Sequence, residues 1–139
     1  MKTVFVFLAL LAFACVRGDA QNRVEVVIKN VKDASGMIRV ALFTNEETFL
    51  KKPMIGKLVK ATAGETIAVF ENVPSGSYAL SVIHDSNENG ELDSNLFGMP
   101  KEGFAFSNDA MGSFGPPSFE KARFTVSNSV VVTVKTRYL

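Results

Sequence analysis

Apolar and polar residues alternate along several short runs of the chain, which is the pattern of β-strands that bury one face. The apolar positions that share a face are Val24, Val26 and Ile28; Ile38, Val40 and Leu42; Tyr78, Leu80 and Val82; and Val130, Val132 and Val134. Residues 33–36 read as a turn between the first two runs. We therefore expect the strands at 23–29 and 37–43 to be antiparallel neighbours.

Further strands are predicted at residues 58–62, 65–72 and 76–84. Two more, at 119–126 and 130–136, are expected to close the chain as a hairpin. With about seven strands, short turns and almost no helix, the sequence predicts an all-β fold. We expect an antiparallel β-sandwich, either transthyretin-like or immunoglobulin-like. A parallel sheet would need helices between its strands, and no segment provides them.

Two segments depart from this simple pattern. Residues 44–60 are ambiguous, because 44–47 can begin one helical turn that Pro53 would end. Residues 85–117 have little periodicity and are rich in Gly, Asn, Pro and Phe. Since a compact domain rarely carries so long an irregular segment without a reason, we treat residues 85–117 as a functional insert.

The insert begins with a sequence that resembles the front of a calcium-binding loop. Residues 85–93 read D-x-N-x-N-G-x-L-D, with oxygen-bearing side chains at loop positions where an EF-hand places its ligands. Gly90 would permit the sharp turn that such a loop needs. The predicted ligands of a Ca²⁺ ion are the side chains of Asp85, Asn87, Asn89 and Asp93 and the carbonyl of Glu91.

The match to a calcium loop is incomplete, because Leu96 stands where an EF-hand carries a bidentate glutamate. The missing oxygen would come from water, or from Asn95, Glu102 or Asp109. With few charged ligands, the dissociation constant is expected at about 10⁻⁴–10⁻³ M, as in extracellular modules. The alternative interpretation is a turn without an ion, since Asn and Asp side chains readily accept backbone N–H bonds.

His84 is the only histidine of the sequence, and it stands beside Asp85. One histidine without a nearby cysteine cannot build a zinc site. We expect its ring to bond to a loop carbonyl or to Asp85, and we predict no catalytic residue. The competing hypothesis is a small hydrolase that uses His84 and the carboxylates of residues 84–102.

Five phenylalanines lie in or next to the insert: Phe97, Phe104, Phe106, Phe114 and Phe119. We expect them mainly to pack at one end of the sandwich, where they replace the core that a loop lacks. Two alternatives stay open. The surface of Phe104, Phe106 and Phe114 would bind a protein or a small ligand, or it would be the interface of a subunit in a larger envelope assembly.

The first 20 residues resemble an export signal, with Lys2, an apolar run at 4–14 and small residues before Gln21. Cleavage there would leave one domain at residues 21–139, periplasmic or extracellular. Lipid anchoring through Cys15, the only cysteine, is the alternative.

Cleavage removes two basic residues and one acidic residue from a chain of net charge +1. The resulting neutral domain gives no indication of a nucleic-acid partner, and no later segment could cross a membrane as a helix.

Long motifs of this chain resemble a known family. They are residues 84–95, residues 98–104, Phe106-Ser107-Asn108 and residues 114–119. Together they resemble an exported bacterial family catalogued as domain of unknown function 2141, and the resemblance implies a single sandwich domain of the envelope or periplasm. Residues 70–80 are also similar to the strand-turn-strand of transthyretin-like and carboxypeptidase-regulatory-like modules, which mostly serve as structural or binding appendages.

Overall fold

The computed structural model describes residues 21–139, so the predicted signal and the anchor at Cys15 lie outside the described residues. The strands are β1 Gln21–Val31, β2 Met37–Phe43, β3 Ile55–Lys60, β4 Gly64–Pro74, β5 Gly76–Asp85, β6 Gly103–Phe106, β7 Phe124–Val126 and β8 Val130–Lys135. Two short helices, η1 Ser107–Asp109 and α1 Phe119–Ala122, complete the elements. Within residues 21–139 no helix is both long and apolar enough to span a bilayer.

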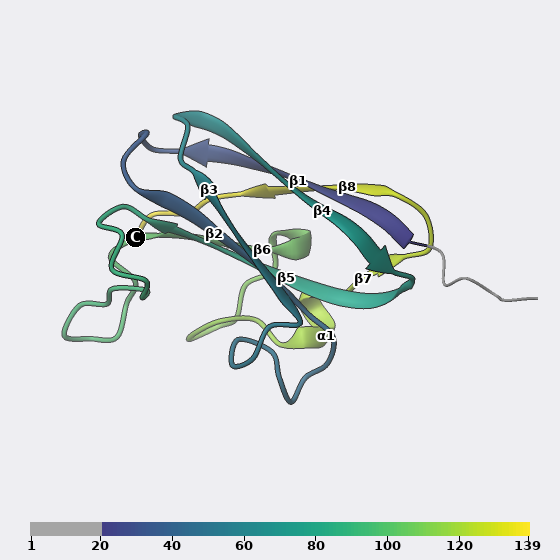
Figure 1. Ribbon diagram of the computed structural model, residues 1–139. Helices are drawn as coiled ribbons and strands as arrows, with labels where there is room; N and C mark the ends of the chain where they lie inside the picture. Colours follow the sequence, from purple (N-terminus) through teal and green to yellow (C-terminus); the bar gives the residue numbers. More distant parts are fainter. Residues whose placement is uncertain (1–20) are drawn as a thin grey trace, which may run out of the picture.

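The strands form two sheets that pack face to face (Figure 1). The smaller sheet has the order β4-β1-β8, and the larger has the order β3-β2-β5-β6, with β7 paired to β5. The predicted β-sandwich is therefore confirmed. The segment at 85–117 that was expected to be irregular contains β6, which pairs with β5, and the short helix η1. One pair departs from the antiparallel expectation, because β1 and β8 run parallel.

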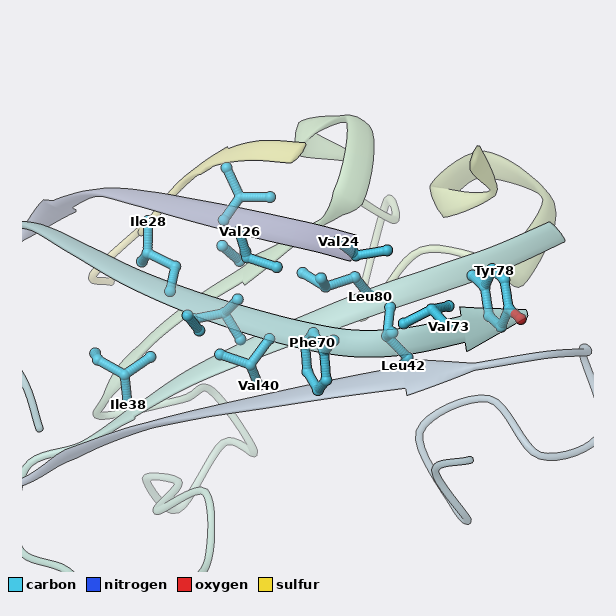
Figure 2. Packing of buried hydrophobic residues seen from close by; sticks show 14 of the residues in the cluster. Val24, Val26, Ile28, Ile38, Val40, Leu42, Phe70, Val73, Tyr78 and Leu80 are labelled. Carbon is cyan, nitrogen blue, oxygen red and sulfur yellow. The ribbon is translucent and has the colours of Figure 1, made fainter. Parts of the chain in front are cut away.

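The alternating pattern of the sequence produces the sandwich core. In β1, Val24, Val26 and Ile28 are fully buried, and their neighbours in the strand are partly or fully exposed. Figure 2 shows these side chains pointing toward those of the larger sheet, such as Val40 and Leu80. Burial of each Val, Leu or Ile side chain contributes about 1.5–3 kcal/mol, so this interface is the main stabilising feature of the domain.

The expected pairing of the first two strands is wrong. β1 belongs to the smaller sheet and β2 to the larger, so residues 32–36 cross between the sheets. Both strands carry an apolar face, and those faces oppose each other across the core. The crossing depends on Gly36, whose φ of +65° lies in the left-handed region that suits glycine.

The expected closing hairpin is also wrong. Residues 119–122 are helical, with the Ser118 side chain capping the helix by accepting the N–H of Lys121. β7 pairs with β5, and β8 pairs with β1, where Val24 lies opposite Val130. The strand-like residues after α1 are thus shared between the two sheets.

Residues 44–54 contain the turn that the sequence suggested. Asn45 Oδ1 accepts the N–H of Thr48 at 2.9 Å, and the N–H of Phe49 donates to the Asn45 carbonyl at 3.1 Å. Phe49 is buried by this turn, whereas Leu50 stays exposed. The chain then enters β3, which pairs with β2.

Candidate functional site

The larger sheet is covered on both faces, whereas each sheet of a simple β-sandwich has one face in the core and one face in solvent. Its outer face carries a second apolar cluster, made of Phe43, Phe49, Ala79, Phe104, Phe106, Phe119 and Ala122. Phe49 is at its centre, with edge contacts to Phe43 and Phe119 at ring centroid separations of 5.3 and 5.9 Å. Figure 1 shows that residues 44–54, residues 86–102 and α1 all lie on this side.

Asp85 ends β5 and is the structural centre of residues 85–93, which we call the Asp85 loop. Its side chain is 3% exposed, and its two oxygens accept the N–H groups of Asn89 and Gly90 at 3.1 and 2.8 Å. Arg39 Nη1 lies 3.8 Å from Asp85 Oδ2. A buried carboxylate is costly unless it is bonded or paired, and here it is both.

Asp93 accepts hydrogen bonds from both asparagine side chains of the loop. Asn87 Nδ2 donates to Asp93 Oδ2 at 2.6 Å, and Asn89 Nδ2 donates to Asp93 Oδ1 at 2.7 Å. The amide oxygens accept backbone N–H groups, that of Asn87 from Asn89 at 3.3 Å and that of Asn89 from Glu91 at 3.0 Å. The side chains of Asn87, Asn89 and Asp93 thus lie together, whereas that of Asp85 bonds to the loop backbone. These bonds form the Asx turns of the alternative interpretation.

Glu102 is the candidate for the missing ligand that the fold brings to this loop. Its side chain is buried, and Glu102 Oε2 accepts the N–H of Asp93 at 3.3 Å. Glu102 Oε1 is buried without a hydrogen-bond partner. By contrast, Asn95 Oδ1 accepts the N–H groups of Phe97 and Met99, and Asp109 Oδ1 accepts that of Lys135.

The donor set of this loop depends on amide oxygens. Within residues 21–139, no group of three or more His, Cys, Asp or Glu side chains is arranged to hold a metal ion. A cation here would need Asn87 and Asn89 besides the carboxylates. Such mixed oxygen donors suit Ca²⁺ and do not suit metals that prefer nitrogen or sulfur ligands.

His84 serves a structural network. Its Nε2 lies 2.7 Å from the Ser35 carbonyl, and its Nδ1 lies 2.8 Å from Tyr138 Oη. Because a carbonyl only accepts, Nε2 carries a proton, and in the neutral ring Nδ1 accepts from the tyrosine. The expectation that His84 bonds to a loop carbonyl is confirmed, and both ring nitrogens are engaged.

The neighbouring turn is tied by Asp33. The backbone N–H and the hydroxyl of Ser35 both donate to Asp33 Oδ1, and these bonds lower the pKa of the Asp33 carboxyl. The turn therefore holds the Ser35 carbonyl where His84 reaches it.

The phenylalanines divide into two groups. Phe104, Phe106 and Phe119 are buried as expected, but they pack on the outer face of the larger sheet and not at one end of the sandwich. Phe97 and Phe114 are 88% and 106% exposed. Phe97 and Phe114 stand at the wall of a cavity of about 1270 Å³ against the outer face of the larger sheet. Phe104 and Phe106 also line this cavity.

Sequence reasoning missed the role of Ser107. This residue is fully buried, and its hydroxyl donates to the Ala122 carbonyl at 2.5 Å while its oxygen accepts the N–H of Leu80 at 2.9 Å. It thereby fastens α1 and η1 to β5. The signal available in the sequence was the position of Ser107 directly after the apolar run Phe104-Ala105-Phe106.

Comparison with known proteins gives a family and no activity. Residues 26–133 match the model of a family described as an uncharacterized protein conserved in bacteria, which is domain of unknown function 2141. No curated protein and no solved structure gives a significant match.

Proposed function

Because the chain belongs to this bacterial family, whose description names no activity, we propose a function from the geometry of the Asp85 loop. The protein is an exported, non-catalytic β-sandwich domain of the cell envelope. A calcium ion held by the Asp85 loop orders the Phe-rich insert at residues 85–117, and the role of the domain is binding or structural support.

The unpartnered Glu102 Oε1 is the observation that carries the calcium proposal. A buried carboxylate oxygen without a partner costs free energy, and a cation beside it removes that cost. The other oxygen of the same carboxylate already meets Asp93, which is one of the predicted ligands. Glu102 can thus replace the glutamate that Leu96 does not supply.

Calcium binding would change the bonds of the loop in a defined way. Asn87 and Asn89 now aim their NH₂ groups at Asp93. Their side chains would have to rotate so that their oxygens face the ion together with Asp85, Asp93 and the Glu91 carbonyl. The backbone N–H bonds to Asp85 can persist, because each carboxylate oxygen has a second lone pair.

The engagement of His84 supports the non-catalytic part of the proposal. A general base must reach the proton that it abstracts, and the His84 ring is 2% exposed with both nitrogens bonded. The hydrolase alternative would require this network to break. Export is supported by the pattern of residues 1–20 and remains part of the proposal.

Calorimetric titration of residues 21–139 with CaCl₂ tests the proposal, with thermal unfolding measured alongside. We expect a dissociation constant of about 10⁻⁴–10⁻³ M. Ca²⁺ at ten times that constant should raise the free energy of unfolding by about 1.4 kcal/mol. The variants Glu102→Gln and Asp93→Asn should lose most of both responses.

Glu91→Gln is the matched control, because the Glu91 side chain is exposed and only its carbonyl is a predicted ligand. This variant should bind Ca²⁺ like the wild-type protein. An absence of heat and of stabilisation up to 10 mM Ca²⁺, which is about ten times the weakest expected constant, would reject the ion site. The loop would then be a set of Asx turns.

A further inference from the structure

The cavity on the outer face of the larger sheet is built from segments that are far apart in the sequence. Its floor includes Phe43 of β2 and Phe104 and Phe106 of β6. Its walls come from Leu50, Lys51 and Pro53, and from residues 97–100 and 111–116. Its volume of about 1270 Å³ exceeds the range of about 300–1,000 Å³ that is typical of small-molecule sites.

The walls expose apolar side chains that pack against little of the protein. Phe114 and Phe97 are almost fully exposed, and Leu58 and Met99 are 56% and 47% exposed. All four line the same cavity. Contiguous exposed apolar surface of this kind marks a binding site, because leaving it in water is unfavourable.

The charged side chains that line the cavity are all basic. Arg39, Lys51 and Lys57 line it, and no Asp or Glu side chain of the described chain does so. The whole sequence is nearly balanced, with 15 basic and 14 acidic residues, so this local bias is distinctive.

The three cations are not equally available to a ligand. Arg39 faces Asp85, and Lys57 Nζ donates to the Val69 carbonyl at 2.5 Å. Lys51 makes no salt bridge or side-chain hydrogen bond within residues 21–139. Lys51 is therefore the cation that a negatively charged ligand can pair with.

We propose that this cavity binds a long-chain carboxylate, a fatty-acid-like amphiphile. Its aliphatic chain lies between the Phe104 and Phe106 floor and the Phe97 and Phe114 walls, and its carboxylate pairs with Lys51. Apolar lining with basic groups matches such a molecule in both polarity and charge. The inference rests on the binding role proposed above, and it does not require the calcium ion.

Displacement of the fluorescent fatty acid cis-parinaric acid by palmitate tests this proposal on residues 21–139. We expect saturable binding of the probe and full displacement by palmitate. The uncharged methyl palmitate should compete more weakly. The protein should not co-sediment with vesicles of phosphatidylglycerol, and co-sedimentation without displacement of the probe by palmitate would mean that the face recognises a lipid surface instead.

Two pairs of variants locate the site. Phe97→Ser should weaken binding about tenfold through lost apolar contact, whereas Leu96→Ser should not, because Leu96 is fully exposed and does not line the cavity. Lys51→Gln should weaken binding about threefold, and Lys52→Gln, outside the cavity, should leave it unchanged. These four side chains are exposed, so the variants should fold.

Equal effects of the cavity and control variants would overturn the proposal, as would a folded protein that binds no probe. Sedimentation in the same buffers identifies the main competitor. If Phe97→Ser abolishes a concentration-dependent dimer and leaves palmitate binding unchanged, the cavity is an interface between copies of this chain. Titrations in Ca²⁺ and in EGTA separate this result from the calcium proposal, since either site can fail while the other is retained.

Discussion

The hydroxyl of Tyr138 joins three segments of the chain that are remote in sequence. It accepts the backbone N–H of Lys32 at 2.9 Å and lies 2.8 Å from His84 Nδ1. Gly103 makes room for the ring, since a Cβ at position 103 would lie 2.5 Å from Tyr138 Cε1. The C-terminal segment is thereby attached to the end of β5, directly before the Asp85 loop.

Removal of this hydroxyl should destabilise the protein measurably. Tyr138→Phe leaves a buried His84 nitrogen without a partner, so we expect the free energy of unfolding to fall by about 1–3 kcal/mol. Urea unfolding at neutral pH measures this loss. Tyr78→Phe is a comparison of similar kind, because it removes the single bond from Tyr78 to the Pro74 carbonyl at 2.6 Å and should cost less.

We also expect the stability of Tyr138→Phe to depend on alkaline pH differently from that of the wild-type protein. Burial raises the pKa of Tyr138, so the folded state favours the neutral phenol. The resulting stabilisation is fully present below the unfolded pKa of about 10, and it is lost as pH rises through the folded pKa. Tyr138→Phe should therefore lose less stability than the wild-type protein between neutral pH and about pH 11. Identical pH profiles would contradict this assignment.

At the scale of single residues, local chemistry was predictable and burial in the insert was not. The contact of His84 with a loop carbonyl follows from its place at a strand end. The exposure of Phe97 and Phe114 does not follow, because composition favours burying phenylalanine. Glu102 was one of three candidate ligands, and only the fold shows that it meets Asp93.

At the scale of elements, alternation located most strands but not β6, and it did not show which strands pair. An apolar face shows which side of a strand is buried, and it carries no information on which strand lies beside it. β1 and β2 both satisfy the pattern while they lie in different sheets. Likewise, the partner of β8 is a parallel strand from the opposite end of the chain, which no local turn signal could indicate.

The crossing between β1 and β2 gives an element-scale prediction. A Cβ at Gly36 would lie 2.1 Å from the Asp85 carbonyl oxygen and 2.7 Å from Ser86 Cα. Gly36→Ala adds this collision to the cost of a left-handed residue, so we expect a loss of more than about 2 kcal/mol. Calcium binding should weaken as well, since the start of the Asp85 loop must move.

Gly64→Ala is the control for this experiment. Gly64 also has a positive φ, of +85°, but no atom lies within 4 Å of the added Cβ. It should cost only the conformational term of about 1–2 kcal/mol, and it should leave calcium binding unchanged. If chemical unfolding shows that the two variants lose the same free energy of unfolding, the contact with Asp85 does not contribute to stability.

At the scale of the whole molecule, stability is distributed unevenly. The sandwich interior is fully buried, whereas residues 86–92 and 94–99 are exposed. The sequence indicated this division, because periodicity stops at residue 85. It could not indicate that the insert, together with residues 44–54, covers a second face of the larger sheet, since that arrangement depends on long-range packing.

Hydrogen exchange should reveal this division. Amides of β1 should exchange only through global unfolding, and those of residues 86–99 through local opening of lower free energy. Ca²⁺ should slow exchange in residues 86–99 more than in β1. In Glu102→Gln this local protection should disappear, and a uniform slowing across the whole chain would argue against a loop that is ordered by the ion.

The parallel pairing of β1 with β8 has a consequence for folding rate. Val24 pairs with Val130, which lies more than a hundred positions later in the sequence. The smaller sheet therefore lacks its edge strand β8 until that part of the chain is available. Folds dominated by contacts between residues distant in sequence fold slowly, typically in milliseconds to seconds. For a chain that we propose is exported, this delay would leave the polypeptide unfolded during passage across a membrane, and the smaller sheet would be completed only after β8 arrives.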